Sequence, residues 1–102
     1  MAAEEKPQKQ LQISIDDSVA NGDYVNFANI IHSPGEFVLD MGRVVPGRSD
    51  VKISSRIIMT PLHAKQFLAA LSQNVAMYEQ KFGEVRIDRA PKPNFTTEEP
   101  SN

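Results

Sequence analysis

The side chains best suited to bind a charged group lie in the middle of the chain: Arg43, Arg48, Lys52 and Arg56. Arginine recognises carboxylate and phosphate groups through paired hydrogen bonds, so the set indicates binding rather than catalysis. Residues 43–65 carry five basic groups and one acidic group, whereas residues 1–42 carry two basic and seven acidic groups. The basic segment is therefore interpreted either as a binding site for an acidic partner or as one side of a charge-paired sheet.

The sequence shows no arrangement typical of an enzyme or a metal site. His32 and His63 have no nearby His, Cys or carboxylate at the spacing of a zinc motif. One loop holds four oxygen-bearing side chains, Asp16, Asp17, Asn21 and Asp23. Their spacing differs from that of an EF-hand, so a plain turn is predicted. Since cysteine is also absent, we expect a non-catalytic protein without cofactor or metal.

Size and composition limit the class of protein. The chain has 102 residues, 40% of them hydrophobic, and a formal net charge of −2, which suits one small domain. The longest apolar run, 67–71, is far shorter than the roughly 20 residues that span a bilayer. The polar start lacks the core of a signal peptide, so a cytoplasmic protein without membrane contact is expected. A pI of about 5.6 argues against a nucleic-acid partner.

The elements that would position the basic side chains are strands. Residues 1–10 and the proline-rich residues 88–102 are predicted to be disordered tails around a single domain, 11–87. Within it, four segments have the pattern of strands: 11–15, 24–32, 37–45 and 51–59. Pro-Gly turns separate the later three, so an antiparallel meander is predicted.

A long helix follows the predicted strands. Thr60 is a suitable N-cap, Pro61 suits the first turn, and Gly83 suits the C-cap, which predicts a helix over 61–82. Its apolar stripe is expected to lie on the sheet: Ala64, Phe67, Leu68, Leu71, Val75, Tyr78 and Phe82. The predicted fold class is α+β, with a three- to four-stranded antiparallel meander followed by one long helix packed on one face.

The opposite side of that helix carries few charges. It includes Gln66, Ala69, Gln73 and Ala76. Two alanines one heptad apart allow close approach of another backbone, which predicts a helix–helix contact between subunits. The alternative is a surface helix rich in alanine and glutamine, since both residues favour helices.

Apolar residues are also predicted on both faces of the sheet. One face is expected to carry Val25, Phe27, Ile31, Phe37, Leu39 and Met41. The other is expected to carry Tyr24, Ala28, Ile30, Val38 and Val44. A single helix covers one face, so Tyr24, Ile30 and Val38 are predicted to meet another subunit. Because so small a core is marginal alone, a homo-oligomer is expected, with a dimer favoured.

Three blocks carry a family resemblance: DYVNF (23–27), HSPGEFVLDMGRVVPGR (32–48) and SRIIMTPLHAKQFLAALSQNVAMYEQKFG (55–83). Over roughly residues 11–85 the chain resembles the bacterial and archaeal family called domain of unknown function 3467. The resemblance implies a small cytoplasmic protein, in some bacterial lineages encoded beside the large RNA polymerase subunits, and hence an accessory role in a large assembly. The order of strands and helix is also loosely similar to the SecB export chaperone.

These observations predict a self-associating protein–protein interaction module that docks on a larger protein through its basic hairpin region. The first alternative is a chaperone that binds unfolded polypeptide. The second is a nucleic-acid-binding protein, which would bind with a steep dependence on salt.

Overall fold

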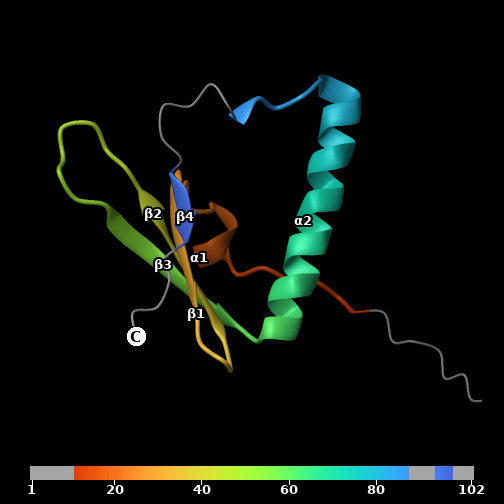
Figure 1. Ribbon diagram of the computed structural model, residues 1–102, viewed down its shortest axis with the longest axis horizontal. Coiled ribbons are helices and arrows are strands. Elements are labelled where there is room, and N and C mark those ends of the chain that lie inside the picture. The colour runs from red at the N-terminus through yellow and green to blue at the C-terminus, as the bar shows by residue number, and fades with distance from the viewer. Residues whose placement is uncertain (1–10, 88–93, 98–102) are drawn as a thin grey trace, which may run out of the picture.

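The computed structural model describes residues 11–87 and 94–97 of the chain. The predicted tail 1–10 lies outside the described residues, as does the predicted tail 88–102 except for residues 94–97. Six elements follow one another (Figure 1): α1 (Asp17–Ala20), β1 (Phe27–His32), β2 (Phe37–Arg43), β3 (Lys52–Met59), α2 (Pro61–Phe82) and β4 (Phe95–Thr97). The predicted α+β class, a sheet followed by one long helix, is confirmed.

The four strands form one sheet in the order β3-β2-β1-β4. β1, β2 and β3 make the predicted antiparallel meander. β4 runs parallel to β1, so the sheet is mixed rather than purely antiparallel. Sequence analysis placed β4 in a tail, but two threonine hydroxyls anchor it, Thr96 Oγ1 donating to Asn29 Oδ1 at 3.0 Å and Thr97 Oγ1 to the Ile30 carbonyl at 3.0 Å.

The observed strands are shorter than predicted where a side chain replaces the backbone. The predicted pairing of 24–32 with 37–45 extends one step past β1 and β2, to Asn26 and Val44. There the Val44 amide donates to Asn26 Oδ1 at 2.7 Å, and Asn26 Nδ2 donates to the Val44 carbonyl at 3.3 Å. The asparagine side chain thus ends the regular ladder by imitating the next peptide group.

The register assigns the side chains to two faces. The inner face, on the side of α2, carries Ala28, Ile30, Phe37, Leu39, Met41, Ile57 and Met59, and the outer face carries Phe27, Ile31, Val38 and Ile58. The predicted grouping of Ile30 with Val38 is therefore wrong. Ile30 pairs with Leu39 and Val38 pairs with Ile31, and directly paired residues share a face.

A β-bulge in β3 shifts one more side chain. Met41 pairs with Ser55 and Gly42 pairs with Ile53, so Ser54 is the extra residue. Ile53 consequently lies on the outer face, whereas a regular alternation along β3 would put it on the same face as Ile57. Gly42 allows the bulge, because a Cβ there would collide with the Lys52 carbonyl oxygen and lie 2.9 Å from the Ile53 Cα.

The ends of α2 are formed by the predicted signals. Thr60 Oγ1 accepts a hydrogen bond from the His63 amide at 3.2 Å, and Pro61 stands at the first helical position. Gly83 has a φ of +101°, and its amide donates to the Glu79 carbonyl at 2.9 Å. Both boundaries are confirmed. Neither described helix has the length and hydropathy needed to cross a membrane.

The burial expected of α2 is not found within the chain. None of its residues is buried, and it approaches the sheet mainly at its first turns, where Pro61, Ala64 and Leu68 line a hollow with Phe37. A one-residue connection starts the helix at the edge of the sheet and directs it away (Figure 1). Among the described residues, the only buried hydrophobic side chains are Ala28 at 1% exposure and Leu39 at 6%.

The segment 11–15 was predicted to be a strand with one buried face, and that prediction is wrong for the single chain. It forms neither helix nor strand. Leu11, Ile13 and Ile15 are 89%, 96% and 62% exposed. In Figure 1 the segment, coloured red and orange, runs away from the sheet, so none of the four strands is its neighbour.

Candidate functional site

An extended apolar surface follows α2. We call its exposed apolar side chains the α2 stripe: Leu68, Leu71, Val75, Tyr78 and Phe82. The rings of Tyr78 and Phe82 lie 4.9 Å apart, centre to centre. A hollow of about 650 Å³ is lined by Leu71, Val75 and Tyr78 together with Val85 and Ile87 beyond the helix. An open apolar hollow beside exposed aromatic residues is a surface suited to another protein chain.

The opposite side of α2 is also uncovered. Gln66, Ala69, Gln73 and Ala76 are all exposed, and Tyr24 is 72% exposed. The predicted helix–helix contact between subunits stays a prediction, as does the role of Tyr24.

The basic residues separate into two sites. Arg43 and Lys52 face each other across β2 and β3, and they line a hollow of about 290 Å³ with Arg48, Val45 and Ser54. We call Arg43, Arg48 and Lys52 the basic hairpin cluster. Like charges directly opposite on neighbouring strands destabilise a sheet, so this hollow favours an acidic group.

One acidic side chain partly neutralises the cluster. Asp50 Oδ1 accepts from Arg48 Nε at 3.0 Å, and Oδ2 accepts from Arg48 Nη2 at 3.3 Å. The hydrogen bonds from Arg48 are the main reason that the pKa of Asp50 is lowered, and Lys52 adds a smaller attraction. Within the described ranges, neither Arg43 nor Lys52 forms a salt bridge. The cluster therefore keeps excess positive charge.

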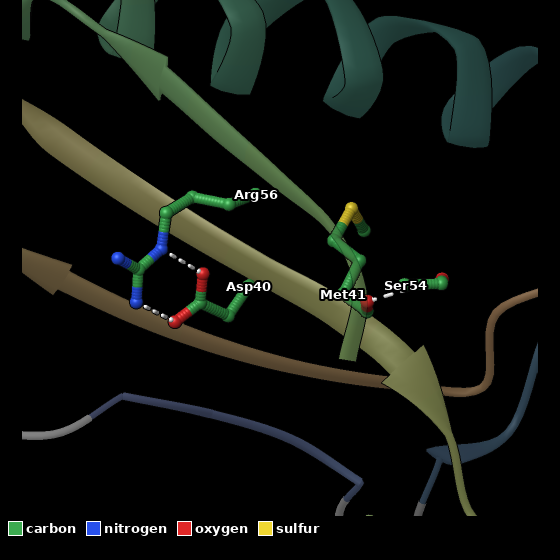
Figure 2. Close-up of polar contacts among 4 residues, drawn as sticks. All are labelled: Asp40, Met41, Ser54 and Arg56. Carbon is green, nitrogen blue, oxygen red and sulfur yellow. Dashed lines mark hydrogen bonds and ion pairs between the residues drawn. The ribbon is translucent and has the colours of Figure 1, made fainter. Parts of the chain in front are cut away.

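Arg56, predicted to act with the other three, lies apart from them. It pairs across the strands with Asp40 on the outer face, whereas Arg43 and Lys52 lie on the inner face. Figure 2 shows the two hydrogen bonds, Nε to Asp40 Oδ1 at 2.7 Å and Nη2 to Oδ2 at 2.9 Å. These bonds hold the pKa of Asp40 below its ordinary value. Arg56 is thus engaged within the sheet.

The two histidines have structural contacts. His63 Nδ1 lies 3.0 Å from Thr60 Oγ1 at the helix start. The His32 ring stacks on Phe37 with centroids 5.6 Å apart. Of the acidic loop, Asp17 belongs to α1 and Asp16 is its N-cap residue. Over the part of the chain that the structure describes, no group of three His, Cys, Asp or Glu side chains could hold a metal ion.

Sequence reasoning missed one further surface, the free edge of β3. This eight-residue strand lies at the end of the sheet. Among the described residues, no strand pairs with the backbone N–H and C=O groups that β3 directs away from β2, which makes the edge a template for another strand. The sequence pattern over 51–59 predicted the strand, but only the order of the strands in the sheet shows which strand lies at an edge.

Comparison with known proteins finds one family. Neither the curated proteins nor the solved structures contain a match. A family model described as protein of unknown function (DUF3467) matches residues 1–87. The match extends over most of the chain and includes every described element except β4. The chain belongs to the DUF3467 family.

Proposed function

We propose that the protein is a non-catalytic, self-associating interaction module of the cytoplasm, most simply a homodimer in its functional form. The observation that carries the proposal is the α2 stripe. Leu71 and Tyr78 are each 51% exposed, and Phe82 is 65% exposed. A helix with good caps and an apolar stripe is normally stabilised by burying that stripe. A second copy offers the same stripe, and a two-fold axis would bring the two together.

The exposure of apolar side chains supports this proposal. Among the described residues, Leu68, Val85 and Ile87 are 63%, 50% and 83% exposed, and only two hydrophobic side chains are buried. So small a core is marginal for a lone subunit. An obligate homodimer takes about 1,000–2,500 Å² from each protomer, which would cover these side chains.

The basic hairpin cluster gives the module a second contact, for acidic groups of a partner. Arg43 and Lys52 are opposite each other, and the only acidic side chain bonded to the cluster among the described residues is held by Arg48. The family resemblance implies genes beside those of large RNA polymerase subunits in some bacterial lineages. We therefore propose an accessory role in a large assembly of that kind.

Light scattering after size exclusion tests self-association. We expect the wild-type protein to be a dimer at tens of micromolar, with an unfolding midpoint that rises with protein concentration. Leu71→Glu places a charge in the α2 stripe and should yield monomer. Ser33→Glu, at the exposed turn between β1 and β2, makes the same charge change away from the helix and should remain dimeric. A wild-type monomer with a concentration-independent midpoint would contradict the proposal.

One more variant distinguishes the two sides of α2. Gln73 lies on the side opposite Leu71, next to the predicted contact residues Ala69 and Ala76. If the α2 stripe is the interface, Gln73→Glu remains dimeric. Dissociation by Gln73→Glu, with Leu71→Glu still dimeric, would assign the contact to the alanine-containing side instead.

The chaperone alternative uses the same surface. The apolar hollow beside Leu71, Val75 and Tyr78 could also receive side chains of an extended polypeptide. A chaperone should bind several unrelated unfolded proteins and suppress their aggregation. An interaction module should ignore them and retain one partner in stoichiometric amount. Competition between unfolded polypeptide and the dimer contact would favour the chaperone.

A further inference from the structure

We propose that residues 11–15, here called the arm, add as an antiparallel strand to the β3 edge of a second copy of the chain. Two copies related by a two-fold axis would exchange arms. The inference rests on the proposed self-association and specifies which segment and which strand meet. Three features support it: the exposed arm, the β3 edge and the excess positive charge of the basic hairpin cluster.

The arm has the sequence of a strand without a sheet. Leu11, Ile13 and Ile15 alternate with Gln12 and Ser14, which is the period of a strand with one apolar face. All three apolar side chains are exposed, Ile13 at 96%. An exposed, regularly alternating segment gains both hydrogen bonds and burial when it joins a sheet.

The β3 edge has the matching length. From Ser55 to Met59 the strand pairs regularly with β2, and the bulge begins at Ser54. These five residues equal the five of the arm. Ile57 and Ile58 in this stretch remain 41% and 55% exposed. The regular part of the edge can therefore accept the whole arm before the bulge interrupts the ladder.

One register aligns the apolar residues. With Ile13 opposite Ile57, Leu11 stands opposite Met59 and Ile15 opposite Ser55. Because Ser55, Ile57 and Met59 belong to the inner face, the apolar side of the arm would extend that face on the side of α2. Gln12 and Ser14 would lie on the outer face. A shift by one residue would reverse the two sides of the arm.

Charge favours the antiparallel direction. Asp16 and Asp17 directly follow the arm, and the Asp16 side chain makes no capping hydrogen bond. In the antiparallel register they reach the bulge and the Lys52 end of β3, beside the excess positive charge of Arg43 and Lys52. In the parallel direction they would lie at the Met59 end, away from this cluster. The second copy would thus supply the acidic groups that the cluster attracts.

The direction of the arm argues for a second copy. Figure 1 shows it leaving its own sheet and running past α2. Exchange of arms would join each subunit to its partner through backbone hydrogen bonds as well as through the α2 stripe. Both contacts would then belong to one continuous interface.

The absence of native cysteine makes disulfide trapping a direct test. Gln12 and Ile58 are opposite each other in the proposed register. We expect Gln12→Cys protein mixed with Ile58→Cys protein to form a disulfide-linked heterodimer under mild oxidation, identified by intact mass. Gln12→Cys mixed with Ser33→Cys, at a turn distant from the β3 edge, is the matched control and should yield at least tenfold less heterodimer.

The double variant Gln12→Cys/Ile58→Cys decides which copy supplies the arm. Exchange predicts a chain linked to a second chain, whereas a closed loop of monomer mass would show that the arm binds its own β3 and would overturn the proposal. Absence of the heterodimer from a protein that is dimeric by light scattering would overturn arm exchange but leave self-association intact. A monomer by light scattering would remove both.

A charge exchange gives a second, oxidation-free readout. Asp17→Lys should weaken the dimer at least several-fold, and adding Lys52→Asp should recover much of the loss. Equal weakening in the single and the double variant would contradict the predicted approach of Asp17 to the cluster.

Discussion

The meander and α2 differ in what stabilises them within one chain. The meander contains both of the buried hydrophobic side chains found among the described residues, Ala28 and Leu39, and its strands satisfy one another's backbone groups. α2 has correct start and stop signals, yet none of its residues is buried. Local signals are thus enough to define where a helix begins and ends, but they do not provide the burial that normally keeps it folded.

This difference between the meander and α2 leads to different expectations for a monomer and for a dimer. If the protein were a monomer, the meander would be its stable part and α2 would resemble an isolated helix, which is marginal in water. If the proposed dimer forms, α2 and the meander should respond to substitution with comparable losses. The substitutions below probe the two regions, beginning with the strongest, and the pair of leucine truncations separates these two cases.

The largest loss is expected in the meander, at Gly42. Gly42→Val would force a Cβ against the backbone of Lys52 and Ile53 and should lower the free energy of unfolding by about 3–4 kcal/mol. Gly35→Val is the matched control, because a Cβ at Gly35 has nothing within 4 Å. Chemical denaturation measures both. Equal losses would mean that the bulge does not require glycine.

The comparison itself is tested by truncating one leucine in each region. Leu39→Ala, in the buried part of the meander, should cost about 2–3 kcal/mol. In a dimer that buries the α2 stripe, Leu71→Ala should cost a similar amount, and the loss should shrink at low protein concentration. A loss below about 0.5 kcal/mol for Leu71→Ala would mean that its side chain remains in water.

The helix cap should have a smaller effect. Thr60→Ala removes the acceptor of the His63 amide and should cost about 1 kcal/mol. Thr60→Ser keeps the hydroxyl oxygen and should retain most of the stability. Helical circular dichroism during unfolding follows the change. If Thr60→Ala were neutral, the cap would not limit the stability of α2.

The smallest effect concerns pH. The pKa of Asp40 is lowered in the folded protein by Arg56, so the ion pair stabilises the fold above the ordinary carboxyl pKa, near 4. This contribution is lost as pH falls through the lowered value. Wild type should therefore lose stability relative to Asp40→Asn on acidification below about pH 5.

Asp50 provides the matched carboxylate for that measurement. Its pKa is also lowered, by Arg48, but its side chain is 62% exposed, against 14% for Asp40. Solvent screens an exposed pair more strongly. Asp50→Asn should therefore change the pH dependence less than Asp40→Asn does. The reverse order would contradict the assignment of the acid-sensitive pair to the outer face.

Local sequence patterns predicted individual helices and strands better than they predicted which elements lie next to each other. Thr60, Pro61 and Gly83 fixed α2 because caps act on the adjacent backbone. The faces of the sheet were harder to predict from the sequence, because they depend on the register between strands. The pairing of Ile30 with Leu39 and the bulge at Ser54 regrouped the apolar residues. β4 was missed because its pairing with β1 spans 67 residues.

The same limit applies to the candidate site. Arg43, Arg48 and Lys52 were predicted as a group and do line one hollow. Arg56 was grouped with them by sequence proximity, but its pairing partner, Asp40, was not identifiable from spacing. The alternation of 11–15 was recognised, whereas the strand that would receive it depends on which edge of the sheet is free.

Thr60 is the whole connection between β3 and α2, since β3 ends at Met59 and α2 begins at Pro61. The proline ring restricts the backbone directly after Thr60, and the hydrogen bond from the His63 amide to Thr60 Oγ1 holds Thr60 to the first turn of the helix. With so short a connection, the direction in which β3 ends sets the direction in which the helix leaves the sheet. Because α2 has 22 residues, a small change of direction at Thr60 would displace Phe82, at its far end, the most.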